Sequence, residues 1–245
     1  MANSKGKATE QLFFDPPLCH DEDAAKLAQE LLKEEGADPN TLVEHKEHGW
    51  ELWFNSQKCT SMHKYASCNK PLTLEVLHDC GGKVDLLDDA GNQPMHYACN
   101  TSIAKKLQQW GADVNALNPK KEIPALTSLA PRIVFAPDEK RMEWIVKELA
   151  EWTKMGAVLE IPNKFGKSVF DIFPKKFSSY AKRARAFYEN YQKDHATISE
   201  TFDLADDQHI KKRLSIGSAD GKEEETFTSA SIPTKHFQKH LGQDR

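Results

Sequence analysis

Two short stretches of the sequence bring together side chains that could act in covalent catalysis. Cys19-His20-Asp21 places a nucleophile, a base and an acid side by side. Catalytic Cys and His are usually neighbours in space and not in sequence, so this order is weak evidence for an enzyme. Asp21 and Asp23 precede the run AAKLAQELL, where acidic residues favour the positive end of a helix. We therefore expect no catalytic residue here.

The second stretch, Lys164 to Ser168, reads KFGKS and resembles part of a phosphate-binding loop. It lacks the GxxxxGK[ST] spacing that lets backbone amides surround a phosphate, so we interpret it as a turn. An enzyme would have to place its site in the irregular segments 1–25 or 41–56, or in the tail. These segments mostly lack paired acid and base residues, and we expect the protein not to be an enzyme.

Histidines and cysteines also invite a metal-site interpretation. Cys59 and His63 have three residues between them, but no matching second pair follows. His78 and Cys80 are closer together than typical zinc ligands. We expect helix-start histidines and packed cysteines, with no metal and no cofactor.

Composition excludes several broad classes. The chain has 245 residues, a net charge of −4 and 39% hydrophobic residues. The charge gives no argument for DNA binding, and no run reaches the roughly 18 apolar residues of a membrane helix. We also expect no signal peptide and no small-molecule substrate. Five scattered cysteines favour reduced thiols and a cytoplasmic location.

The elements that would position these residues follow a repeated order. Leu74 and Leu77, and later Ile103 and Leu107, have helical spacing. Gly81-Gly82 and Gly111 come directly after these segments, where glycine can take the left-handed conformation that ends a helix. Pro94 fits the first turn of another helix. The repeated unit is a turn, a helix, a short break, a second helix and a glycine.

The unit also recurs with a fixed period. His63 and His96 both follow a methionine and lie 33 residues apart. The pattern resembles the ankyrin repeat, D-x-x-G-x-T-P-L-H-x-A-A followed by L-L-x-x-G-A-D-V-N. The matching residues are Asp88, Gly91, Pro94, His96 and Ala98, then Gly111, Ala112, Asp113, Val114 and Asn115. We expect an all-α ankyrin-repeat solenoid of four to five degenerate helix-turn-helix units with β-turn tips, insertions near 41–56 and 131–138, and a polar C-terminal tail.

The expected organisation has four parts. Residues 1–57 form an N-terminal capping repeat with an insertion, and residues 58–175 form the repeats. Residues 176–193 form a capping helix, because a stack must cover its last apolar face. Residues 194–245 are polar and largely disordered.

The resemblance implies a non-catalytic module that binds another protein through its turn tips and first helices. The candidate binding residues are Asp88, Asp89, Asn92, Asn118, Lys120, Lys121, Lys164 and Phe165 at the tips, and Lys64 and Tyr97 in the first helices. These tips run from acidic to basic, which favours a partner with an opposing charge gradient. Replacing Asp88 and Asp89 with Lys is then expected to weaken binding and to leave thermal unfolding almost unchanged.

Other features leave alternatives open. Trp50 and Trp53 either pack on a neighbouring repeat or anchor a partner. The basic face of residues 175–193 is either a solvated cap or a surface for nucleic acid or acidic lipid. Ser215 follows Lys211-Lys212-Arg213 and is a candidate kinase site. Glu223-Glu224-Glu225 in the tail raises the alternative of a secreted bacterial effector that acts in the host cytoplasm.

Overall fold

The computed structural model describes residues 2–14, 20–44 and 57–195. In chain order the elements are α1 (Ala2–Phe14), α2 (Asp21–Lys33), β1 (Val43–Glu44), β2 (Lys58–Cys59), α3 (Ser61–Ser67), α4 (Pro71–Asp79), η3 (Pro94–Tyr97), α5 (Thr101–Gln109), α6 (Pro124–Val134), α7 (Glu139–Lys154), η4 (Val169–Ile172) and η5 (Lys175–Phe177). Residues 178–195 are also helical.

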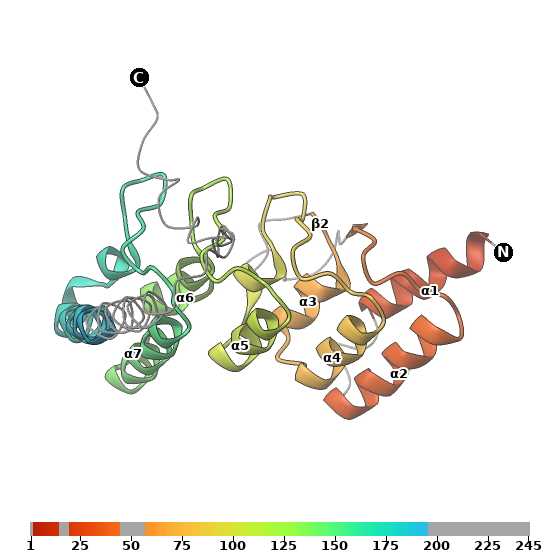
Figure 1. The fold of residues 1–245 in the computed structure, drawn as a ribbon, viewed down its shortest axis with the longest axis horizontal. Helices are drawn as coiled ribbons and strands as arrows, with labels where there is room; N and C mark the ends of the chain where they lie inside the picture. Colours follow the sequence, from red (N-terminus) through yellow and green to blue (C-terminus); the bar gives the residue numbers. More distant parts are fainter. Residues whose placement is uncertain (1, 15–19, 45–56, 196–245) are drawn as a thin grey trace, which may run out of the picture. The chain divides into compact units, whose positions relative to one another are not determined.

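The helices form two packed rows (Figure 1). In the first row α1 contacts α3, α3 contacts η3, η3 contacts α6, and α6 contacts η4. In the second row α2 contacts α4, and α5 contacts α7. The first-row helices before η4 also contact the helix that follows them in sequence, as α3 does with α4. The fold is therefore an all-α stack of helix pairs, as the repeat pattern predicts.

The second-row helices end as their glycines predict. Gly81 and Gly111 have φ values of 88° and 96°, in the left-handed region. The amide of the residue after Gly111, Ala112, donates to the carbonyl of Leu107 at 3.0 Å. This bond satisfies a carbonyl that the helix end would otherwise leave unpaired. The chain then leaves the helix toward the next turn.

Two parts of the fold differ from the prediction. The first helix of the third repeat is a 3₁₀ helix of four residues, η3, since the chain leaves the helix after Tyr97. The expected all-α architecture also contains a short antiparallel pair, in which Val43 of β1 lies opposite Cys59 of β2. These strands flank residues 45–56, which lie outside the described residues.

The long helix after the second insertion packs as predicted. Met142, Ile145, Leu149 and Trp152 of α7 are all buried in the core. The helix begins at Asp138, whose carboxylate accepts from the Arg141 amide at 2.8 Å. The apolar stripe of α7 thus faces the repeats.

The helix at 178–195 lies against the last repeat. Ala184 and Tyr188 are buried, and the Tyr188 ring lies 5.7 Å from that of Phe170 in η4. Arg183 forms two 2.9 Å hydrogen bonds with the carboxylate of Glu143 in α7. The helix thus packs on the last repeat, and its role as a cap stays a prediction.

Candidate functional site

Three loops between successive repeats share one turn geometry. In each loop the first residue donates its amide to the fifth residue's carbonyl, and the fourth residue's amide donates back to the first residue's carbonyl. The first residue's side-chain Oδ1 also accepts from the amides of the third and fifth residues. We call these finger loops, and their residues are 88–92, 118–122 and 163–167.

This geometry places Asp88 and Asn118 inside the fingers and not on their surface. The Tyr97 hydroxyl donates to Asp88 Oδ2 at 2.5 Å, and Asn92 Nδ2 donates to the same hydroxyl at 2.9 Å. Asn118 Nδ2 then donates to Asn92 Oδ1 at 2.9 Å, which joins two fingers. All four side chains are buried. The structure therefore uses these four predicted binding residues to hold the loops together.

Lys64 is also enclosed, contrary to the expectation of a binding side chain on a first helix. Only 7% of this residue is exposed. Its ammonium lies 4.3 Å from the ring centroid of Phe13 and 4.9 Å from that of Phe14. Both rings belong to α1, so Lys64 connects the second repeat to the N-terminal helix.

The two repeat histidines connect neighbouring repeats. The Thr60 amide donates to Nδ1 of His63, which leaves the proton on Nε2, 3.0 Å from the carbonyl oxygen of Asn92. His96 repeats this arrangement one unit later, with Gln93 as donor and the carbonyl of Glu122 as acceptor. Burial lowers the pKa of His63 to about 4 and lowers the pKa of His96 as well. Both histidines are therefore neutral at pH 7.

The remaining predicted finger residues lie at the surface. Asp89, Lys121 and Lys164 are exposed, Phe165 is 70% exposed, and Lys120 is half-buried. The Lys164 amide donates to the Lys120 carbonyl at 2.8 Å, so the second and third fingers are neighbours. The Asp89 carboxylate accepts from the Gln57 amide at 2.9 Å.

The sequence interpretation missed an apolar residue that stands directly before the first residue of two fingers. Leu87 is 55% exposed and Leu117 is 47% exposed. Both occupy the same position in their repeats, immediately before Asp88 and Asn118. Large apolar side chains that recur at a surface are typical of interaction sites. This recurrence was visible in the sequence once the repeats were aligned.

The first two finger loops also pack closely on one another, through Gly91 and the side chain of Pro119. Gly91 has a φ of 78°, and a Cβ atom built there would lie 2.5 Å from Cγ of Pro119 in the next finger. Only glycine permits both the left-handed turn and this approach. Together with the bonds across the fingers, this contact makes a continuous edge. We define the finger edge by its exposed side chains Leu87, Asp89, Leu117, Lys121, Lys164 and Phe165.

The sequence motifs considered for catalysis have structural roles where the structure describes them. Asp21 accepts from the amides of Leu72 and Thr73 at 2.9 and 3.2 Å, so its carboxylate caps α4. Cys59 is buried. Four of the five residues of the KFGKS stretch, 164–167, lie in a finger loop, so this stretch is a turn as the sequence predicted.

The described residues form neither a metal site nor a helix that could span a membrane. Among residues 2–14, 20–44 and 57–195, no group of three His, Cys, Asp or Glu side chains is arranged to hold a metal ion. Within these same ranges, the helices are too short or too polar to cross a bilayer. Trp50, Trp53, Cys19 and Ser215 lie outside the described residues.

Comparison with known proteins bears on the fold. The family model described as Ankyrin repeat matches residues 90–119, which run from the turn at Gly91 through η3 and α5 to the next finger. A search of curated proteins gave no match. The matched segment is one of the stacked helix pairs described above, and its neighbours on both sides repeat its turn and its helix contacts. Residues 90–119 therefore match an ankyrin repeat, and they lie within a stack of helix pairs of the same kind.

Proposed function

We propose that the finger edge binds a partner protein through a mixed apolar and basic surface. Ankyrin repeats are in general protein-interaction modules that lack catalytic activity. The observation that carries this proposal is the exposure of Leu87 and Leu117 at equivalent positions of consecutive repeats, with Phe165 exposed on the next finger. An apolar side chain repeated along one edge has no role in the core and is available to a partner.

The charges along the edge indicate what kind of partner fits. Lys121 and Lys164 stand beside Leu117 and Phe165, while Asp89 stands beside Leu87. The expected partner therefore has an apolar strip with acidic residues facing the second and third fingers. Asp88, which the sequence analysis placed on this surface, is excluded from the binding set because it is buried.

The proposal is tested by substitution within the full chain. The edge variant carries Leu87→Asn, Leu117→Asn and Phe165→Ala, and the control variant carries Lys26→Glu and Lys147→Glu on the exposed faces of α2 and α7. Proteins that co-purify with the unmodified chain should also co-purify with the control and should be lost with the edge variant. Equal retention by both variants would contradict the proposal, and thermal unfolding verifies that both remain folded.

Three further expectations remain predictions. The division into capping and repeat segments at 57, 175 and 193 is untested by any contact described here. The cytoplasmic location is inferred from the cysteine content alone. The effector alternative depends on the tail, which lies outside the described residues.

A further inference from the structure

The first helix of the third repeat is short, and this creates a space between its neighbours. Thr73 and Ile103 occupy matching positions in the second helices of consecutive repeats. Thr73 follows its repeat histidine, His63, by ten residues, whereas Ile103 follows His96 by only seven. The four residues of η3 therefore stand between the seven of α3 and the eleven of α6. The ends of α3 and α6 extend past η3 with no helix between them.

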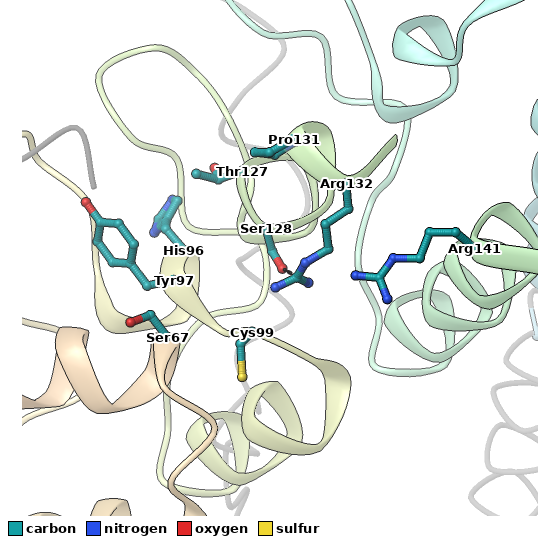
Figure 2. Close-up of a pocket in the computed structure, with 9 residues that line it drawn as sticks. All are labelled: Ser67, His96, Tyr97, Cys99, Thr127, Ser128, Pro131, Arg132 and Arg141. Atoms are coloured by element: carbon teal, nitrogen blue, oxygen red, sulfur yellow. Dashed lines mark hydrogen bonds between the residues drawn. The ribbon is translucent and has the colours of Figure 1, made fainter. Parts of the chain in front are cut away.

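A cavity of about 330 Å³ fills this space. Its wall includes the last residue of α3, the residues after η3, the second half of α6 and the first turn of α7 (Figure 2). We call it the arginine pocket and define it by Ser67, Cys99, Ser128, Pro131, Arg132 and Arg141. Its volume lies within the range typical of small-molecule sites.

Two positive charges converge on this pocket. In Figure 2 the side chain of Arg141, from α7, extends toward the guanidinium group of Arg132, from α6, which lies beside Ser128. Both lie near the Trp144 ring, at 5.9 and 4.5 Å from its centroid. The approach of two like charges is unfavourable unless an anion neutralises them.

Within the described part of the chain, neither guanidinium forms an ion pair, whereas Arg183 and Arg185 do. Glu148, the acid that acts on Arg132 most directly, is already engaged. Its carboxylate accepts from the Thr101 amide at 2.9 Å and from the Thr101 hydroxyl at 3.3 Å. Among residues 2–14, 20–44 and 57–195, no acidic side chain forms an ion pair with these two cationic donors.

The hydroxyl groups of the wall leave these guanidinium donors available. Ser128 Oγ donates to the Ala98 carbonyl, and Ser67 Oγ donates to the Lys64 carbonyl, each at 2.7 Å. The hydrogen bond from Arg132 to Ser128 Oγ is long, at 3.4 Å. Most of the N–H groups that could bind an incoming anion therefore belong to the arginines.

We propose that the arginine pocket binds a phosphorylated side chain of a protein partner, with Arg132 and Arg141 holding the phosphoryl oxygens. A phosphoryl group carries about −1.5 to −2 charge and three acceptor oxygens, which match two forked guanidinium groups. A single carboxylate would neutralise only one of them. This inference rests on the proposed function, because it takes the phosphoryl group to be part of a partner protein.

The test uses the full chain and a short alanine peptide with one central phosphoserine. Binding is followed through the arginine Nε–H resonances in ¹⁵N-correlated NMR spectra. The phosphopeptide should give saturable shifts for Arg132 and Arg141, while the unphosphorylated peptide should give none. Arg132→Gln and Arg141→Gln should each weaken binding about tenfold or more, since each removes charge-assisted hydrogen bonds.

The controls separate this proposal from folding and from the finger edge. Arg183→Gln removes a guanidinium already paired with Glu143 and should leave phosphopeptide affinity unchanged. Arg141 is exposed in the first turn of α7, so its variant should keep the wild-type unfolding temperature even if that of Arg132 does not. The edge variant should bind the phosphopeptide normally, so failure of one proposal is distinguishable from failure of the other.

Several results would overturn the proposal. Absence of saturable shifts, or unchanged affinity in the Arg141→Gln variant, would remove the site. Equal binding of a glutamate peptide would remove the preference for a phosphoryl group. Binding of inorganic phosphate without the phosphopeptide, or arginine-dependent sedimentation with phosphoinositide vesicles alone, would assign the pocket to a free anion or to a lipid headgroup.

Discussion

The imidazole of His63 joins two repeats, since its Nε2 lies 3.0 Å from the backbone oxygen of Asn92 in the next finger. His96 makes the corresponding contact with Glu122, at 3.3 Å. Each ring accepts a hydrogen bond on Nδ1 and donates from Nε2, which is possible only for a neutral imidazole. Protonation would place a proton on Nδ1, facing a backbone amide, and would break this arrangement.

The free energy of unfolding should therefore fall as the pH is lowered below the ordinary pKa of histidine. Because burial lowers the pKa of His63 to about 4, below the ordinary value of 6.5, the unfolded chain binds more protons between these values. The stabilisation is fully present above about pH 6.5 and is lost as the pH falls toward 4. The lowered pKa of His63 corresponds to a loss of up to about 3 kcal/mol of unfolding free energy on acidification. The lowered pKa of His96 adds to this loss.

Urea unfolding at several pH values measures this effect. The difference in unfolding free energy between the wild-type chain and His63→Gln should be largest at pH 7 and should shrink toward pH 4.5. His20→Gln, at an exposed position before α2, serves as the control and should leave the pH dependence unchanged. A constant difference across this range would show that His63 is not held neutral by burial.

The adjacent residues Asp88 and Asp89 should respond very differently to charge reversal. Asp88 is buried and accepts hydrogen bonds from the Tyr97 hydroxyl and from the amides of Ala90 and Asn92. Asp88→Lys should cost about 3–5 kcal/mol, because it buries an unpaired cation beside those donors. Asp89→Lys should cost about 1 kcal/mol or less, since the carboxylate is exposed and loses one hydrogen bond.

Denaturant unfolding of the two single variants tests this contrast. The sequence-based expectation that both charges could be reversed without affecting unfolding would then hold for Asp89 alone. Equal losses of stability in the two variants would contradict the buried position of Asp88.

The contact between Gly91 and Pro119 predicts that Gly91→Ala destabilises the fold more than the same substitution at another left-handed glycine. Gly111→Ala should cost about 1–2 kcal/mol for left-handed strain, since a Cβ atom there meets nothing within 4 Å. Gly91→Ala should cost a further 1–3 kcal/mol or so, because its Cβ would lie 2.5 Å from Pro119 Cγ.

A double-mutant cycle separates the two contributions. Adding Pro119→Ala to the Gly91→Ala chain should recover most of the extra cost, while adding it to Gly111→Ala should recover none. The free energies come from urea unfolding. If Gly91→Ala and Gly111→Ala are equally destabilised, the fingers do not pack as the structure describes.

The repeat stack could be predicted from sequence because its signals are local. Each signal indicates its element within a few residues of sequence. These signals are the glycines after the second helices, Pro94 at a helix start and the two Met-His pairs. The N-terminal helix α1 was not predicted, although Ala8, Leu12 and Phe13 have helical spacing and are buried. The apolar positions of α1 are few and stand among Gly6 and polar residues, so their spacing alone does not indicate a helix.

The surface was harder to predict than the fold, because exposure depends on hydrogen bonds between separate fingers. Asp88 and Asn118 are polar residues in turns, which favours a surface position, but their side chains satisfy loop amides and a neighbouring finger. The arginine pocket depends on three missing residues in one repeat. That deficit was visible in the sequence, but the convergence of Arg132 and Arg141 depends on the packing of α6 against α7.

The central claim, that this stack recognises a protein along its finger edge, is tested most directly by hydrogen–deuterium exchange on the full chain with a co-purified partner. Binding should slow exchange at the amides of residues 86–91, 116–121 and 161–167, and should leave the exposed faces of α2, α4 and α5 unchanged. Protection confined to those second-row helices, with exchange in the finger loops unaltered, would contradict the account.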